Sequence, residues 1–299
     1  MLYLNYKSGM MILPVTGVFT DTAQVQGRER CDMKEKKGIR RPAVIAELAV
    51  LAAVAAFLIA DIYLLPSQVT QPAMVSISAA GVSGNPDGSD ELTLEGKLAD
   101  SSKGVGDIRY TEENGRISVS IYQTAVSYLH ENSFSEIYDA AGQIDSVYVC
   151  GRPVWDDGTD ISERTGDIFC TRHDNVGDMP ANEKTAQAVG IADEFGAYTS
   201  ELKTDAEPYS WTIRLSGTDI SGDNEKEMQQ KMQNDACVLI AQIGNLDTVN
   251  FEYTSGTGGK CTYSVTEESA DKYVGESVKA LGKTPSGLQK LMEACGSKL

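Results

Sequence analysis

The sequence predicts an α+β fold, with helices packed on one face of a mainly antiparallel sheet, preceded by a single N-terminal transmembrane helix. Three observations support it: a long apolar run near the N-terminus, strand pairs with two-residue alternation, and capped amphipathic helices between those pairs. The chain has 299 residues and 41% hydrophobic content, which is enough for a packed core.

Residues 1–42 are predicted to be a short cytoplasmic segment. Residues 1–32 show no clear hydrophobic period, whereas Met33 opens a basic stretch followed by an apolar one. We therefore expect translation to start at Met33, with the preceding residues as an upstream extension.

The apolar run Ala43–Leu65 is predicted to cross a membrane, since it corresponds to about 35 Å of helix. Basic residues crowd its N-terminal side, and the next basic residue after the run is Lys97. The positive-inside rule then places the N-terminus in the cytoplasm and the long C-terminal part outside the cell. A cleaved signal peptide is the competing interpretation, but the run is long and the residues after it make a poor cleavage site.

The extracytoplasmic part is predicted to begin with a flexible tether, because Pro66–Asp90 is rich in Ser, Gly, Pro and Ala and has no basic residue. Two parts follow, at residues 91–164 and 165–299. Within the first, Asn114-Gly115 is the dipeptide best suited to a tight hairpin turn, and Ile117, Val119 and Ile121 alternate on one face. The expected elements are strands 107–112 and 116–121, helices 122–130 and 134–141, a strand 144–150 and an acidic loop 156–160.

The second part, residues 165–299, is predicted to alternate helices with strands. Its longest helix should begin at Asp223 or Asn224 and end near Gly244, with Met228, Met232, Ala236, Leu239 and Ile243 as its core stripe. Val249, Phe251 and Tyr253 should pair with Cys261, Tyr263 and Val265 across a glycine-rich turn. The other expected elements are strands 167–171 and 209–216, a helix 181–190, and helices that begin at Thr266 and at Thr284-Pro285.

Charge and cysteine usage exclude several classes of function. A formal net charge of −17 and a pI near 4.5 argue against a nucleic-acid partner, because phosphate binding depends on lysine and arginine. The six cysteines include no C-x-x-C pair, so neither a zinc cage nor a thioredoxin-like site is expected. Five of them follow the apolar run, namely Cys150, Cys170, Cys237, Cys261 and Cys295. Their pairing, if any, is left open, and Cys237 and Cys261 have the pattern of buried small apolar residues.

The candidate ligand-binding residues are polar or aromatic side chains in two short segments: Trp155, Asp156, Asp157, Asp160, Arg172, His173 and Asp178. Acids around Gly158 could bind calcium or act as a pair in glycoside cleavage, although their spacing is not that of an EF-hand. His173 could act as a general base, but a solvated histidine at the end of a strand is the simpler interpretation. Neither a G-x-S-x-G elbow nor a dinucleotide fingerprint is present, so we expect no catalytic residue, metal or cofactor.

The second half resembles the bacterial family called domain of unknown function 4825, over about residues 165–295. The matching stretches are GDIFCTRHDNVGDMPANEKTA (Gly166–Ala186), ELKTDAEPYSWTIRL (Glu201–Leu215), ACVLIAQIGNLDTVNFEY (Ala236–Tyr253) and YSVTEESADKYVGESVKAL (Tyr263–Leu281). The resemblance implies an extracytoplasmic domain of Gram-positive bacteria, found on anchored chains or appended to membrane sensors. It implies no reaction and no catalytic residue.

We therefore expect a membrane-anchored, non-enzymatic binding or sensory module at the cell envelope, whose partner is an envelope protein or a small ligand. Two alternatives stay open. An envelope hydrolase would bring acids such as Asp156, Asp157 or Asp160 together with His173 in one pocket. A structural accessory of a membrane complex would expose an apolar patch.

Overall fold

A computed structural model describes residues 49–56, 67–69, 71–86, 88–124, 130–216, 220, 224–256 and 258–296. Residues 49–56 are helical, while residues 1–48 and the rest of the predicted span Ala43–Leu65 lie outside the described residues. The described part of the chain contains no helix with the length and apolar character needed to cross a membrane. The described residues from Ser67 onward belong to one compact unit.

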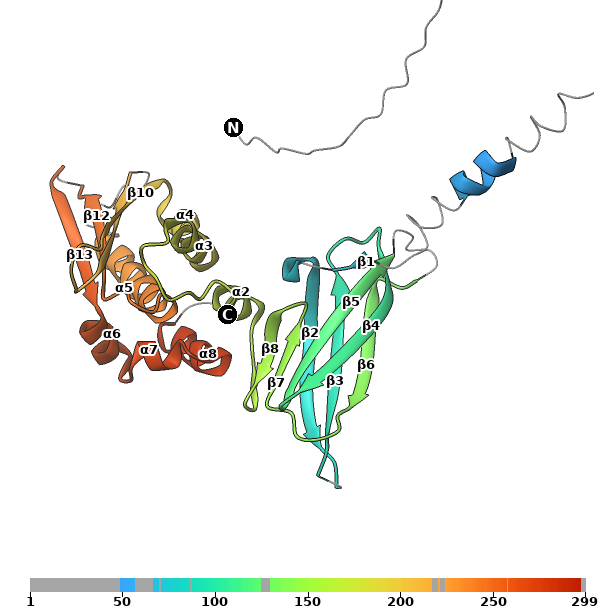
Figure 1. Cartoon of the computed structure of the whole chain (residues 1–299). Helices are drawn as coiled ribbons and strands as arrows, with labels where there is room; N and C mark the ends of the chain where they lie inside the picture. The colour runs from blue at the N-terminus through green and yellow to red at the C-terminus, as the bar shows by residue number, and fades with distance from the viewer. Residues whose placement is uncertain are drawn as a thin grey trace, which may run out of the picture. The chain divides into compact units, whose positions relative to one another are not determined.

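The first part of this unit consists of two β-sheets that share one hydrophobic core (Figure 1). One sheet has the order β1-β5-β7-β8-β9, with β4 paired to β5, and the other has the order β2-β3-β6. The core draws on both sheets, for example through Leu92 and Leu94 of β3 and Ile117 and Ile121 of β5. The strands are β1 (Ser67–Gln68), β2 (Val75–Gly84), β3 (Asp90–Leu98), β4 (Gly104–Glu113), β5 (Arg116–Thr124), β6 (Ser133–Asp139), β7 (Ser146–Val149), β8 (Arg152–Asp156) and β9 (Thr159–Asp160), with a short 3-10 helix η1 (Pro72–Met74) before β2.

The hairpin predicted around Asn114-Gly115 is confirmed. Strands β4 and β5 pair antiparallel, and both turn residues have positive φ, 50° at Asn114 and 76° at Gly115. Ile117, Val119 and Ile121 are buried on one face of β5, as their alternation predicts. The strand predicted at 144–150 is also confirmed as β7, which lies parallel to β5.

Substituting Gly115 by alanine tests this turn. A Cβ atom there would lie 2.3 Å from Oδ2 of Asp145, and the backbone conformation is one that costs an L-residue about 1–2 kcal/mol. We expect Gly115→Ala to lower the free energy of unfolding, measured by chemical denaturation, by more than about 2 kcal/mol, because the contact with Asp145 adds to the backbone cost. Gly151→Ala is the control, because Gly151 has φ of 88° but nothing within 4 Å of its Cβ position. An equal loss of unfolding free energy at both positions would show that the contact with Asp145 does not contribute to the destabilisation.

Several predictions for the first part are corrected. Residues 75–84, expected within the flexible tether Pro66–Asp90, form strand β2, which pairs with β3 and buries Val75. The helix expected at 122–130 is wrong for Tyr122–Thr124, which belong to β5, and residues 125–129 lie outside the described part. The helix expected at 134–141 is wrong, because this segment forms strand β6 at the edge of the three-stranded sheet. In this strand Phe134 is buried and Ile137 is exposed.

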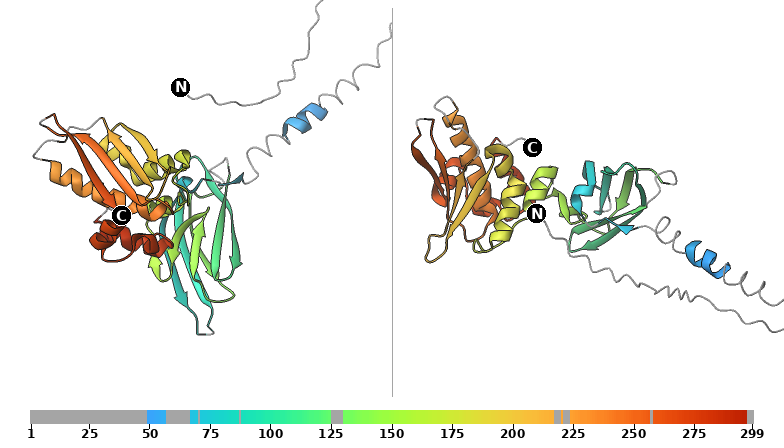
Figure 2. Two further views of the ribbon diagram at one scale, coloured as in Figure 1. Left: turned by 60° about the vertical axis from the view of Figure 1, so that its left-hand side comes forward. Right: turned by 90° about the horizontal axis from the view of Figure 1, so that it is seen from above.

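The second part is a four-stranded sheet with helices on one of its faces (Figure 2). Its order is β10-β11-β12-β13, antiparallel except for the parallel pair β11 and β12, whose connection contains α5. The buried side chains of β11 and β12, including Trp211, Ile213, Val249 and Phe251, belong to the same core as the α5 residues Met232, Ala236 and Leu239. The elements are α2 (Glu163–Phe169), α3 (Met179–Val189), α4 (Ile191–Phe195), β10 (Tyr198–Lys203), β11 (Ser210–Leu215), α5 (Glu225–Gln242), β12 (Thr248–Thr254), β13 (Lys260–Thr266), α6 (Glu267–Val274), α7 (Val278–Leu281) and α8 (Pro285–Ala294).

Most predicted elements of the second part are confirmed. Val249, Phe251 and Tyr253 pair with Val265, Tyr263 and Cys261, in that order. Helices α6 and α8 begin after Thr266 and Thr284, whose side chains accept hydrogen bonds from backbone N–H groups in the first turn. The strand expected at 167–171 is wrong, because residues 163–169 form α2, capped by Ser162. The fold is α+β, as predicted, with mixed and antiparallel sheets.

A buried arginine joins the two parts. Arg152 of β8 is 2% exposed, and its Nη2 atom donates a hydrogen bond of 2.7 Å to the carbonyl oxygen of Val75 in β2. The same guanidinium forms ion pairs of 3.3 Å with Glu163 and 3.4 Å with Asp167, both on α2. The carboxylate of Glu163 also accepts a hydrogen bond from the backbone of Ile77 in β2. One side chain therefore connects β2, β8 and α2.

Candidate functional site

The predicted acidic loop is the tight turn between β8 and β9. Trp155 and Asp160 are paired across this hairpin, and Asp157 has φ of 45° in the turn itself. Oδ2 of Asp156 accepts hydrogen bonds from the backbone N of Ser286 (3.0 Å) and from its Oγ (2.6 Å). A carboxylate at a helix N-terminus is favourable there, so Asp156 anchors the start of α8.

The second predicted segment is at the start of the four-stranded part. Both ring nitrogens of His173 lie near oxygen atoms, Nδ1 at 3.0 Å from the carbonyl of Thr171 and Nε2 at 2.9 Å from Oδ1 of Asn182. The backbone of His173 bridges to Ile243 at the end of α5, and Asp178 caps α3. Arg172, between Thr171 and His173, lies in the connection from α2 to α3.

The acidic turn and His173 have different partners: Asp156 binds the start of α8, whereas His173 is bound to Thr171 and Asn182. Within the described residues, no group of three or more His, Cys, Asp or Glu side chains is placed to bind a metal ion. The contacts of Asp156, His173 and Asp178 are those of residues that join neighbouring elements.

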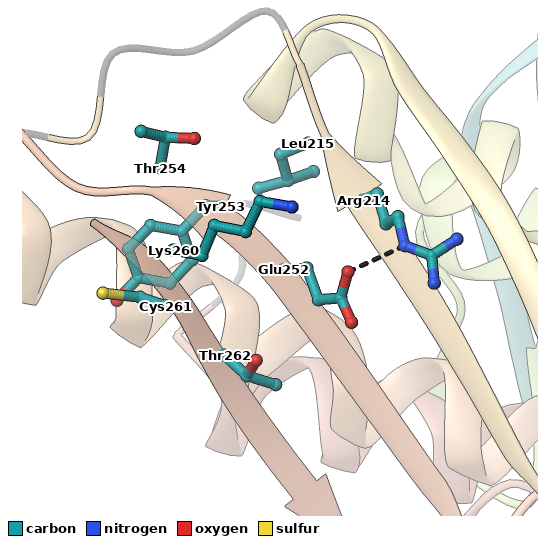
Figure 3. Close-up of a pocket in the computed structure, with 8 residues that line it drawn as sticks. All are labelled: Arg214, Leu215, Glu252, Tyr253, Thr254, Lys260, Cys261 and Thr262. Carbon is teal, nitrogen blue, oxygen red and sulfur yellow. Dashed lines mark hydrogen bonds and ion pairs between the residues drawn. The ribbon is translucent and has the colours of Figure 1, made fainter. Parts of the chain in front are cut away.

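One hollow lies at the end of the four-stranded sheet, between β11, β12 and β13 (Figure 3). It has a volume of about 350 Å³, and its lining includes Arg214, Glu252 and Lys260. Arg214 donates a hydrogen bond of 2.7 Å to Glu252 and also pairs with Glu201 on β10. The guanidinium of Arg214 on β11 is therefore paired with a carboxylate on each of the two neighbouring strands.

A second pocket, of about 430 Å³, contains a more unusual group. Its lining comes from α2, α4, α5 and Gly296, which lies two residues after the end of α8. The lining residues are Arg164, Asp193, Glu194, Lys231, Asn234, Asp235 and Gly296. Both signs of charge are therefore present around one cavity, which is within the size range of small-molecule sites.

Asp235 is the buried carboxyl of this pocket. Its residue is only 5% exposed, and its Oδ2 atom has no hydrogen-bond partner among the described residues. Burial raises the pKa of Asp235 well above its usual range, and the nearby carboxylate of Glu194 raises it further. The positive charges of Arg164 and Lys231 lower this pKa but do not cancel the effect of burial. The pKa of Asp235 is therefore raised mainly by burial, and one of its oxygens has no hydrogen-bond partner in the described part of the chain.

The basic groups of the pocket are positioned by the helices. Nη2 of Arg164 donates a hydrogen bond of 2.8 Å to the carbonyl of Val189, at the end of α3. Lys231 is 3.1 Å from Glu227, one turn earlier on α5, and both side chains are largely solvated. An ion pair of that kind is worth little, so Lys231 can turn toward a ligand at small cost.

Sequence reasoning missed Asp235, although a signal was present. Residues 228, 232, 235 and 239 recur at helical spacing, so Asp235 lies on the same stripe as Met228, Met232 and Leu239. A carboxyl on the core stripe of a helix is costly to bury, and such residues concentrate at functional sites.

Comparison with known families adds one finding. Residues 173–266 match the family described as Domain of unknown function (DUF4825). This region of the chain is a DUF4825 domain. The DUF4825 region contains Asp193, Glu194, Lys231 and Asp235, whereas Arg164 and Gly296 lie on either side of it. No curated protein and no solved structure matches the chain.

Proposed function

We propose that the chain is a membrane-anchored extracytoplasmic module of the bacterial cell envelope that binds a small amine-bearing ligand in the Asp235 pocket. The observation that carries this proposal is the buried Asp235 carboxyl in a polar cavity of about 430 Å³, with one oxygen that no described residue binds. A buried polar group without a partner costs stability, so its presence in a cavity indicates a use for it.

The chemistry of the pocket favours an ammonium group. A cation beside Asp235 would ionise the carboxyl and form a charge-assisted hydrogen bond, which is stronger than a neutral one. Glu194 adds negative charge near the same point, while Lys231 offers positive charge to an anionic group of the ligand. Free amino acids and short peptides carry both charges and are small enough for the cavity.

The anchor in this proposal is Ala43–Leu65. Residues 49–56 of this run form a helix whose side chains are all exposed, including Val50, Leu51 and Val54. Apolar side chains displayed around a helix favour a lipid environment. The basic residues before the run support a cytoplasmic N-terminus.

Ligand binding is tested by thermal unfolding of the full-length protein in detergent with millimolar amine probes. The probes are the common amino acids, their amides, aliphatic diamines and, as negative controls, carboxylic acids without an amine. At least one amine-bearing class should raise the Tm, and Asp235→Asn should weaken its binding about tenfold or more, the value of one hydrogen bond to a charged group.

Asp193→Asn is the matched control, because it removes one negative charge from an exposed position in the same pocket. It should change binding much less than Asp235→Asn. If no amine probe stabilises the wild-type protein, or if Asp235→Asn binds equally well, the proposed ligand class is wrong.

The proposed location is tested separately with a tag after Leu299. Protease added to intact protoplasts should remove the tag, while a cytoplasmic marker stays intact. A tag that is protected until the membrane is permeabilised would contradict the extracytoplasmic placement without bearing on the pocket.

A further inference from the structure

Two buried cysteines from distant parts of the chain meet in the core of the second part. Cys237 lies on α5 and Cys295 follows α8, and both belong to the same hydrophobic cluster. Helices α5 and α8 pack against each other, which brings both side chains into the same core, and Cys237 accepts a hydrogen bond of 3.4 Å from Gln233. We propose that Cys237 and Cys295 are a redox site that forms a disulfide between α5 and the end of α8.

The pairing is specific among the described cysteines. Cys150, Cys170 and Cys261 are at least partly exposed. Cys150 lies in the turn between β7 and β8, Cys170 directly follows α2, and Cys261 lies in β13. The Sγ atom of Cys170 is 3.5 Å from the carbonyl oxygen of Gly151, a backbone acceptor. Thiols on two packed helices need only a small adjustment to reach disulfide geometry, whereas distant thiols would need movement of the backbone.

The environment makes the two thiols unequal. The hydrogen bond from Cys295 lowers the pKa of Cys237, outweighing the opposite effect of its burial. The same hydrogen bond raises the pKa of Cys295, with burial adding to the shift. Because thiolates are the attacking species in thiol–disulfide exchange, Cys237 is the first nucleophile of the pair.

Oxidation needs a small disulfide or the disulfide of an oxidoreductase as the electron acceptor. The Cys237 thiolate attacks one sulfur of this acceptor, which forms a mixed disulfide and releases one thiolate. Cys295 then loses its proton and attacks the sulfur of Cys237, which releases the second thiolate. In total the two cysteines lose two protons and two electrons, and the acceptor disulfide becomes two thiols.

Both thiols are buried, so the exchange takes place before α8 docks or while it is transiently detached. Gly296, the neighbour of Cys295, lines the Asp235 pocket, so the disulfide would also fix one wall of that cavity. In the cell the oxidant depends on the proposed extracytoplasmic location. The reaction of the purified protein depends neither on that location nor on the proposed ligand.

The experiment uses the reduced full-length protein in detergent, unfolded and then refolded with oxidised glutathione, so that burial does not limit access. Acid quenching, alkylation with N-ethylmaleimide and peptide mass mapping should show one linkage, Cys237 to Cys295, with the other four cysteines, Cys31, Cys150, Cys170 and Cys261, alkylated. The oxidised protein should have a Tm about 5–10 °C above that of the reduced protein, since the bridge closes a long loop.

Cys261→Ser should still form the linkage, while Cys237→Ala and Cys295→Ala should not form it and should show no rise in Tm on oxidation. The proposal is overturned if both cysteines remain alkylated after oxidative refolding, or if the linkage joins either of them to another cysteine. Mapping of protein isolated from membranes under acid quench then reports the redox state in the cell.

Discussion

Replacing Arg152 by alanine is expected to lower the free energy of unfolding by about 3 kcal/mol. This figure combines the loss of a hydrogen bond from a charged donor with the loss of side-chain packing. Arg152 is buried, and its removal leaves the carbonyl of Val75 without this donor and empties the space above Gly166. Chemical denaturation of the full-length protein measures the change.

Glu163→Gln is the matched control for Arg152→Ala. The carboxylate of Glu163 is about half exposed, so its ion pair is screened by water and should contribute less than about 1 kcal/mol. If Glu163→Gln and Arg152→Ala had equal effects, the ion pair rather than the buried guanidinium would join β2, β8 and α2.

Asp235→Asn is expected to stabilise the protein, and the gain should depend on pH. Burial raises the pKa of Asp235 in the folded protein, whereas the unfolded chain has a pKa near 3.8. Between these two values the folded state binds more protons than the unfolded state, so the wild-type stability falls as pH rises. Asparagine does not titrate, so the variant should gain relative to wild type by about 1.4 kcal/mol per pH unit within that window.

The gain should vanish below the pKa of the unfolded chain, where Asp235 is protonated in both states, and become constant above its folded pKa. Thermal or chemical unfolding at a series of pH values measures this curve. The groups around Asp235 are Glu194, Arg164, Lys231 and the thiol of Cys237, so Asp193→Asn serves as a control for net charge. That exposed substitution should change stability by less than about 0.5 kcal/mol at every pH.

The elements that the sequence predicts correctly are those with strong local signals. Asn114-Gly115 dictates the β4–β5 hairpin, alternation sets the register of β12 with β13, and Thr266 and Thr284 mark helix starts. In each case the residues that determine the element are adjacent in the chain, so no knowledge of distant contacts is needed.

The elements that were missed depend on tertiary context. Phe134, Ile137 and Tyr138 have helical spacing, yet the segment is a strand because it completes the sheet edge beside β3. Strand β2 is rich in small residues typical of linkers, and its conformation comes from pairing with β3. Local propensity is a weak guide where pairing with a distant strand decides the conformation.

The candidate site was predicted less well than the fold. Acidic residues near Gly158 and the polar run at His173 attract attention in the sequence, but their contacts are structural. Asp235 escapes notice because its importance depends on burial, and residues of α2 and α4 together with Gly296 surround it in the folded protein. The spacing of Asp235 with Met228 and Met232 was the available signal.

The central claim is that burial raises the pKa of the Asp235 carboxyl well above its ordinary value and that a ligand cation in the pocket is its charge partner. Its most direct test is carbon NMR of the full-length protein with labelled aspartate carboxyl groups, using Asp235→Asn to assign the resonance. We predict that this carboxyl titrates well above the ordinary aspartate value of 3.8 in the absence of ligand. A titration midpoint at or below that value would contradict the account.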